Sequence, residues 1–271
     1  MDFNQWNAFW ATCFSVMAFL IIVGNTFTIV TLLKKKFYKR PQFLLISLAF
    51  ADLLVGCATT LFVIDEYRLF PLSFVFNMLD MFAGFSSIFH LAVISLERLH
   101  ATLRPFAHRQ LSLKAYSVAI ATPWILSLSM GISISTLTWF SLIMGRKIPI
   151  IVIICLITPL LITCFSYLLI WGEKRKRTLR SFRQNQESRF SRTIFLVTSA
   201  SFMTWIPFMY FNVELYLHVA TSLPRVMPLT AFFFIKLLHF SNSFVNFIIY
   251  IVRFPSYRKV LCSLCRFYNV L

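Results

Sequence analysis

Long apolar runs recur along the whole of this chain, and they restrict its fold more than any single motif does. Hydrophobic residues make up 59% of the 271 residues and charged residues only 13%, a balance that is unusual for a soluble domain. Runs of about twenty apolar residues are long enough to cross a bilayer as α-helices. We therefore predict an all-α membrane protein with seven spans, at about residues 9–33, 43–64, 74–101, 115–139, 148–171, 192–217 and 229–252.

The net charge of +17 could indicate nucleic-acid binding, but its distribution indicates a membrane protein. Most of the 26 Lys and Arg fall on one set of loops and span ends, the exceptions being Arg68, Arg146, Lys147, Arg225 and Lys236. By the positive-inside rule the basic side is cytoplasmic. We expect an extracellular N-terminus and a cytoplasmic C-terminus, with the basic surface facing anionic lipids and an intracellular partner, and no nucleic acid.

Two charges in the third predicted span point to function, because ionisable residues are expensive inside a membrane. Arg98 follows Glu97 near one end of the span, and Asp80 lies eighteen residues earlier. Eighteen residues make five helical turns, or about 27 Å, so Asp80 and Arg98 share one face. Such a helix carries an acid near one membrane surface and an arginine near the other, which suits a protein that passes a signal across the membrane.

Asp52 lies near the middle of the second predicted span, where a carboxylate needs hydrogen-bond partners, a cation or a proton. Candidate partners on three other spans are Asn25, Ser87, Asn242, Ser243 and Asn246. One interpretation is that these groups only form interhelical hydrogen bonds. The other, which we favour, is a hydrated cation site around Asp52.

Glu187 is a candidate partner for Arg98, because it opens the sixth predicted span. A pair between them would join the cytoplasmic ends of the third and sixth spans. The residues alone favour the alternative, in which Glu187 is a solvated residue in a loop that also carries Arg183, Arg189 and Arg192.

Motifs in successive spans together resemble those of rhodopsin-like (class A) G-protein-coupled receptors, of which this chain would be a divergent member. They are Gly24-Asn25, Leu48-Ala49-x-x-Asp52-Leu53, Glu97-Arg98-Leu99, Trp124, Pro159 with Tyr167, Trp205-x-Pro207, and Asn242-Ser243-x-x-Asn246-Phe247-x-x-Tyr250. Each motif is weak alone, whereas one motif in every span, in the right order, is specific.

The resemblance implies a receptor in the plasma membrane that is not an enzyme and that activates a heterotrimeric G protein. Asp52, Ser87, Asn242 and Asn246 would line a sodium pocket, with no other cofactor. Arg98, beside Glu97, would be released on activation from Glu187 to contact the G protein. Tyr167 and Tyr250 would then hold the active arrangement.

The resemblance also divides the chain into a seven-transmembrane domain, residues 1–253, and a final segment, residues 254–271. That segment would contain a short amphipathic eighth helix, starting at Phe254 and Tyr257, and a cytoplasmic tail. Cys262 and Cys265 resemble a palmitoylation site. The chain departs from the family pattern at Ser73, where a disulfide cysteine is usual, and at Leu99, Ser201 and Phe247, the last replacing a proline.

For the ligand site the resemblance gives six candidates, Asp80, Trp205, Phe208, Met209, Lys236 and Phe240. Asp80 matches the position at which amine receptors of the family hold a cationic nitrogen, and Trp205 would form the floor. The fifth span, around Ile151 and Cys155, lacks the serines that would bind catechol hydroxyls. Lys236 could instead neutralise Asp80 internally, in a receptor for a lipid or peptide. A retinal-binding photoreceptor is less favoured, since Phe240 stands at the level where animal opsins carry their lysine.

Overall fold

The computed structural model describes residues 3–34, 40–67, 72–139, 148–176, 182–221, 227–253 and 255–268, and within these ranges all regular structure is helical. The helices are α1 (Ala8–Leu32), α2 (Arg40–Glu66), α3 (Ser73–Leu103), α4 (Pro105–Arg109), α5 (Leu113–Trp139), α6 (Ile148–Lys176), α7 (Phe182–Thr221), α8 (Leu229–Arg253) and α9 (Pro255–Tyr268). The predicted all-α class is confirmed, because the seven long helices α1–α3 and α5–α8 match the seven predicted spans.

Six of the long helices, α1, α2, α3, α5, α6 and α8, are long and apolar enough to cross a membrane, judged on the described residues. The seventh, α7, begins at Phe182, earlier than the predicted boundary at 192. Residues 182–192 contain neither Pro nor Gly, so nothing ends the helix where its apolar part begins. Large apolar side chains on the outside, such as Phe19, Leu161 and Phe165, are exposed, as expected where lipid covers a bundle.

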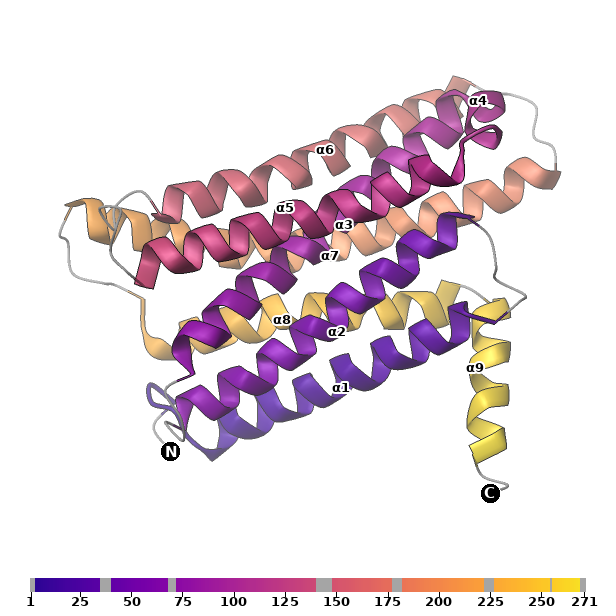
Figure 1. Cartoon of the computed structure of the whole chain (residues 1–271). Helices are drawn as coiled ribbons and strands as arrows, with labels where there is room; N and C mark the ends of the chain where they lie inside the picture. Colours follow the sequence, from indigo (N-terminus) through magenta and orange to yellow (C-terminus); the bar gives the residue numbers. More distant parts are fainter. Residues whose placement is uncertain are drawn as a thin grey trace.

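The long helices lie side by side in one bundle, and α9 runs across their direction at the end opposite the N-terminus (Figure 1). Within this bundle α3 is central, since it packs against α2, α5, α6 and α7. In the most apolar window of α3, 67% of the residues are buried, compared with 22% in α5. The helix that carries Asp80 and Arg98 therefore has protein neighbours on most sides.

Local signals explain several helix ends. Asn7 caps α1, because its Oδ1 accepts hydrogen bonds from the backbone N–H of Phe9 at 2.9 Å and of Trp10 at 3.2 Å. The short helix α4, which the sequence did not predict, starts with Pro105, a residue favoured in the first helical turn. Ser73, in place of a disulfide cysteine, begins α3 and donates a hydrogen bond to Oδ1 of Asp65 at 2.8 Å. This bond joins the ends of α2 and α3.

The amphipathic helix α9 is fixed to the bundle through Tyr257. Its side chain is buried, and its hydroxyl is hydrogen-bonded to Oγ1 of Thr28 on α1 at 2.9 Å. Burial raises the pKa of the Tyr257 phenol to about 12, so the hydroxyl stays protonated well above physiological pH. Cys262 is exposed on the same helix, while the side chain of Cys265 lies outside the described residues.

Candidate functional site

A buried ion pair joins α3 to α8. Nζ of Lys236 donates a hydrogen bond to Oδ2 of Asp80 at 2.6 Å, and the two side chains are only 9% and 4% exposed. A single charge at this depth would be strongly destabilised, whereas the two together compensate each other. Of the two roles that the sequence left open for Asp80, amine anchor or internal pair, the second is the arrangement seen in this structure.

Aromatic rings surround the ammonium group of Lys236. Its Nζ lies 5.4 Å from the ring centroids of Phe76, Phe208 and Phe240, which come from α3, α7 and α8. A cation within about 6 Å of a ring face is stabilised by the ring quadrupole. The rings and Asp80 therefore hold the ammonium group in place from several sides.

Asp80 lies at the edge of a small cavity of about 10 Å³, between α3, α6, α7 and α8. A space of this size holds about one water molecule. The lining is otherwise largely apolar and includes Met81, Phe85, Val152, Leu156, Trp205 and Phe208. The side of α6 that faces this cavity carries Val152 and Leu156. Each of these follows a predicted residue, Ile151 or Cys155, by one position, and neither side chain has a hydroxyl group.

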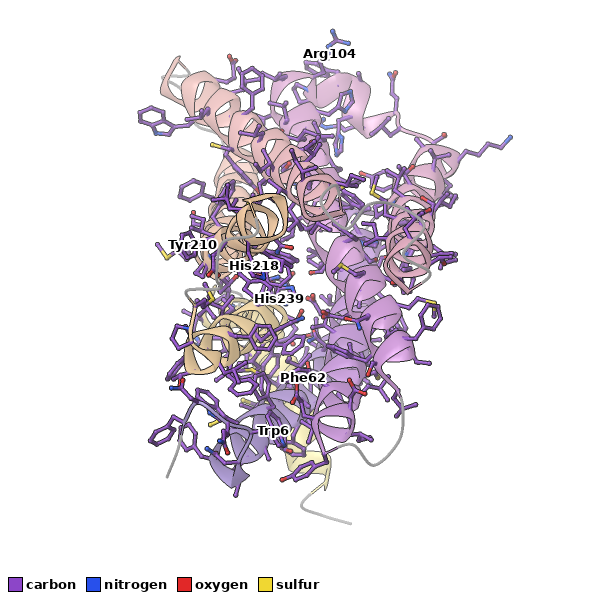
Figure 2. All side chains as sticks on the ribbon, turned by 90° about the vertical axis from the view of Figure 1, so that its left-hand side faces the viewer. Trp6, Phe62, Arg104, Tyr210, His218 and His239 are labelled. Carbon is purple, nitrogen blue, oxygen red and sulfur yellow. The ribbon has the colours of Figure 1, made fainter. Side chains whose placement is uncertain are left out.

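His239 also lines the cavity, although no sequence motif indicates it. Figure 2, which views the bundle from the end where the N-terminus lies, places its side chain in the interior. The imidazole stacks on Phe208 with ring centroids 4.4 Å apart and contacts Trp205 edge-on, also at 4.4 Å. His239 follows Lys236 by three residues, so the helical repeat could have identified it as a neighbour on the same face.

Of the remaining predicted ligand residues, two line this cavity and two do not. Trp205 and Phe208 line it directly. Phe240 is fully buried and packs between α1 and α2, against Phe14 and Phe62. It is one of the three rings around the Lys236 ammonium group and does not line the cavity. Met209 is partly buried and packs against the hydrophobic cluster that contains Trp205.

The second polar site is centred on Asp52, which is fully buried. Its Oδ1 accepts hydrogen bonds from the hydroxyls of Ser87 at 2.7 Å and Ser243 at 2.9 Å. Its Oδ2 accepts one from Nδ2 of Asn246 at 2.7 Å. The structure thus brings together groups from α2, α3 and α8, as the sequence predicted for this carboxylate.

Other polar groups around Asp52 make bonds of their own. Asn242 does not reach the carboxylate; its Oδ1 instead accepts a hydrogen bond from Thr204 on α7 at 3.3 Å. Asn25 donates to the backbone carbonyl of Ser243 at 3.0 Å. Oδ1 of Asn246 is buried with no hydrogen-bond partner among the described residues. A carboxylate, two hydroxyls and a spare amide oxygen are hard oxygen ligands, so this set of groups fits a small cation such as sodium.

A third polar group, not predicted from the sequence, joins α2, α3 and α5. The hydroxyl of Ser47 is hydrogen-bonded to Nε2 of His90 at 2.8 Å and accepts a bond from Nε1 of Trp124 at 2.9 Å. Nδ1 of His90 lies 2.7 Å from the backbone carbonyl of Ser86. All three side chains are thereby satisfied, which indicates a structural role.

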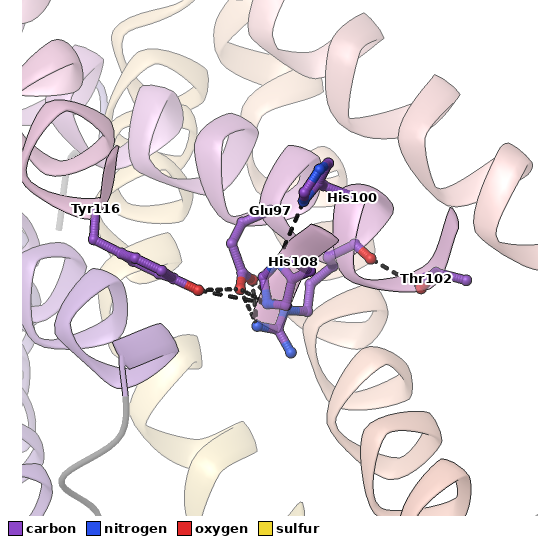
Figure 3. Close-up of polar contacts among 6 residues, drawn as sticks. Glu97, His100, Thr102, His108 and Tyr116 are labelled. Carbon is purple, nitrogen blue, oxygen red and sulfur yellow. Dashed lines mark hydrogen bonds and ion pairs between the residues drawn. The ribbon is translucent and has the colours of Figure 1, made fainter. Parts of the chain in front are cut away.

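At the other end of α3, Arg98 forms an ion pair with the adjacent Glu97. Figure 3 shows that Glu97 is also contacted from two further elements. Its Oε1 accepts a hydrogen bond from the hydroxyl of Tyr116 on α5 at 3.1 Å and lies 3.2 Å from Nε2 of His108 on α4. Nδ1 of His108 is in turn 3.3 Å from Nδ1 of His100. Glu97 therefore links Arg98 to the short helix α4 and to α5.

The other predicted switch residues lie near this end of the bundle. Tyr167 on α6 and Tyr250 on α8 are buried in one hydrophobic cluster with Tyr257, and Tyr167 contacts Phe195 of α7 with ring centroids 5.7 Å apart. The side chain of Glu187, the predicted resting partner of Arg98, lies outside the described residues. Among the described residues, Arg98 forms an ion pair with Glu97.

These features define a multi-pass membrane protein with a seven-helix bundle and buried polar sites along its central helix. The sequence model of the 7 transmembrane receptor (rhodopsin family) matches residues 24–250, and this chain belongs to that family. The family consists of signalling receptors, so the protein is a receptor and not an enzyme.

The chain is similar over shorter stretches to several named receptors. It is 37% identical to dopamine receptor 4 of Caenorhabditis elegans over 117 residues, which are 40% of this chain and 23% of that protein. It is 33% identical to 5-hydroxytryptamine receptor 2B of Dichotomyctere fluviatilis over 135 residues, 46% of this chain and 29% of that protein. Somatostatin receptor type 5 of Rattus norvegicus is 28% identical over 209 residues, 68% of this chain and 56% of that protein.

Proposed function

We propose that this receptor binds an extracellular ligand in the cavity beside Asp80 and activates a heterotrimeric G protein through the end of α3 that carries Arg98. The observation that carries the proposal is the placing of two buried ion pairs on one central helix. The Asp80–Lys236 pair joins α3 to α8 near one end, and the Arg98–Glu97 pair lies near the other.

The distribution of basic residues supports the orientation of the receptor. Most Lys and Arg lie on loops and helix ends that the order of the spans places on the same side of the membrane as Arg98. The positive-inside rule assigns such a side to the cytoplasm. The N-terminus is then extracellular and α9 cytoplasmic, at the plasma membrane. The basic surface and the exposed Cys262 of α9 would favour contact with membrane lipids, the cysteine as a palmitoylation site together with Cys265.

The route between the two ends follows contacts between α3 and α8. A ligand that separates Lys236 from Asp80 removes a direct polar contact between these two helices, which are joined a second time through Asp52 of α2, the acceptor of hydrogen bonds from Ser87 and Asn246. Sodium at Asp52 would stabilise the inactive packing. Release of Arg98 from Glu97 would then make its guanidinium group available to the G protein, with Tyr167 and Tyr250 holding the new arrangement.

Asp80 supports a ligand with a positively charged nitrogen. Two of the relatives are named as receptors for dopamine and 5-hydroxytryptamine, both small amines, and a third as a receptor for the peptide somatostatin. Trp205 and Phe208 offer apolar contacts beside the carboxylate. A lipid or peptide ligand that leaves the Asp80–Lys236 pair intact is the alternative.

A ligand screen with a G-protein readout tests this function. Membranes containing the full chain would be treated with amines, peptides and lipids, and nucleotide exchange on added G proteins measured. We expect at least one ligand to raise exchange, and Arg98→Ala to remove the response while binding persists. Persistent exchange in Arg98→Ala would contradict the proposed coupling site, and no exchange with any G protein, including basal exchange, would contradict the function.

A further inference from the structure

We infer that the ligand of the Asp80 cavity is a small zwitterion, with an ammonium group for Asp80, a carboxylate for Lys236 and an apolar side group for the cavity. The inference rests on the proposed function, and it narrows the ligand to one chemical class. Free amino acids with large apolar side chains are the simplest members of this class.

The charges of the site give the first argument. Asp80 and Lys236 are buried together and compensate each other at 2.6 Å. A ligand that carries only an ammonium group could bind Asp80 only by displacing Lys236, which would leave a buried lysine without its counter-charge. Stranding one member of a buried pair is strongly unfavourable. A zwitterion inserted between the two residues compensates both charges.

The surroundings of Lys236 give the second argument, because they keep its ammonium group at the site. Phe76, Phe208 and Phe240 each place a ring centroid 5.4 Å from Nζ, and the residue as a whole is only 7% exposed. A lysine held by three rings does not leave for solvent when a ligand takes its carboxylate partner. The Lys236 ammonium group therefore stays at the site, and the ligand must supply a negatively charged group to pair with it.

The cavity itself gives the third argument. Two polar ring atoms on its wall, Nε1 of Trp205 and Nδ1 of His239, are buried and have no hydrogen-bond partner among the described residues. Unsatisfied buried polar groups are rare in proteins, and here both belong to rings beside Asp80. In this structure the cavity holds about one water molecule, so a zwitterion can enter only as Asp80 and Lys236 separate and the space beside Met81, Phe85 and Leu156 widens. A carboxylate in that space can accept a hydrogen bond from the Trp205 indole.

The experiment uses matched probes that differ only in charge. Phenylalanine, phenethylamine and 3-phenylpropanoate share the same ring. Phenylalanine carries both charges, phenethylamine only the positive charge, and 3-phenylpropanoate only the negative charge. Leucine, 3-methylbutylamine and 4-methylpentanoate form the aliphatic set. Binding is measured by thermal stabilisation of the purified full chain, and signalling by nucleotide exchange on a G protein. We expect the zwitterion of at least one set to bind about 30-fold or more tightly than both of its singly charged analogues, the order of effect for removing one partner of a buried charge pair.

Substitutions of the pair should change this selectivity in opposite directions. Lys236→Met should remove the need for the carboxylate, so that the amine binds at least as well as the amino acid. Asp80→Asn should favour the acid in the same way. The double variant Asp80→Asn/Lys236→Met contains no buried charge and serves as the folding control; it should lose discrimination among the three probes.

The outcomes separate this inference from the proposed function. A singly charged probe that equals or exceeds its zwitterion in the parent chain overturns the inference, and so does failure of both zwitterions to stabilise it. Equal potency of a ligand in the parent and the double variant also overturns it, because such a ligand ignores the pair. Stabilisation by a zwitterion without nucleotide exchange would support the ligand class and contradict the proposed coupling to a G protein.

Discussion

The ring of Phe247 on α8 occupies the space beside Gly24 on α1 that a side chain at Gly24 would need. A β-carbon added to Gly24 would lie 2.9 Å from Cδ1 of Phe247, closer than such atoms approach in real structures. Phe247 stands where the family pattern has a proline, and α8 continues through it from Leu229 to Arg253. The phenyl ring thus packs a continuous helix closely against α1, and this packing requires a glycine.

Substitution of Gly24 should therefore destabilise the bundle. We expect Gly24→Ala to lower the free energy of unfolding by about 1–3 kcal/mol, the usual cost of adding a methyl group to a tightly packed core. Thermal unfolding of the purified receptor measures the effect. Gly172→Ala is the matched control, because nothing lies within 4 Å of a β-carbon there and alanine favours the helix. Equal effects at the two positions would contradict the close contact with Phe247.

The anchor of α9 gives a second stability prediction. Tyr257→Phe removes the hydrogen bond to Thr28 and should cost about 1 kcal/mol. Because the pKa of Tyr257 is raised to about 12, the phenol stays neutral in mildly alkaline solution. The stability difference from the parent should therefore be the same at about pH 7 and about pH 9. Above about pH 10 the phenol ionises in the unfolded chain but not in the folded protein, so the stability difference should shrink as the pH rises from about 10 towards 12. A difference that has already disappeared at about pH 9 would contradict the raised pKa.

The sequence predicted well those features that depend on one helix at a time. Apolar runs identify the spans because each span must satisfy its own backbone and match the bilayer thickness. That Asp52 belongs to a polar site also followed from its position in the chain, because a carboxylate in the middle of a span needs hydrogen-bond partners. Neighbours across helices were harder, because they depend on how each helix is rotated. Asn242 bonds to Thr204 and not to Asp52 for this reason.

Side-chain neighbours at the ends of α3 were least predictable. His108 contacts Glu97 only because the short helix α4 turns back toward α3, and no motif indicates that helix. His239 joins the cavity through the same helical repeat that places Lys236, but a single histidine in an apolar span is not a specific signal. Whether Glu187 pairs with Arg98 or is solvated could not be decided from the sequence, because that depends on how the third and sixth spans pack against each other.

Release of Arg98 should raise basal signalling. Glu97→Gln keeps the size of the side chain but removes the charge that pairs with Arg98, and a hydrogen bond to a charged group contributes about 1.5–3 kcal/mol. We expect basal nucleotide exchange to rise several-fold at equal surface expression. Tyr116→Phe, which removes one hydrogen bond to Glu97 but leaves its charge paired with Arg98, should have a smaller effect.

The predicted pairing with Glu187 can be tested in the same assay. If Glu187→Ala raises basal exchange while Glu97→Gln leaves it unchanged, the restraint on Arg98 comes from α7 and the role assigned to Glu97 is wrong. Arg98→Ala should lower exchange in both backgrounds without changing ligand affinity.

The Asp52 site should make agonist affinity depend on sodium. Sodium bound by Asp52, with hydroxyl ligands from Ser87 and Ser243, would stabilise the inactive arrangement and weaken agonist binding, by about fivefold or more for a typical coupling free energy. Affinity would be measured in sodium chloride and in an equal concentration of a large organic cation. Asp52→Asn should abolish the difference and Ser87→Ala should reduce it. If the parent chain binds the agonist with equal affinity in the two salts, the three hydrogen bonds to Asp52 have only a structural role.

The Asp80–Lys236 pair should show strong coupling in the absence of any ligand. Asp80→Asn leaves Lys236 buried without a counter-charge, and Lys236→Met does the same to Asp80, so each single change should cost about 3–5 kcal/mol. The double variant has no charge to strand and should recover most of the loss, since replacing a whole buried pair is often nearly neutral. Thermal unfolding of the four proteins gives the interaction free energy directly. Additive losses in the double variant would mean that the two charges are compensated separately, and that the 2.6 Å contact does not restrain α3 against α8.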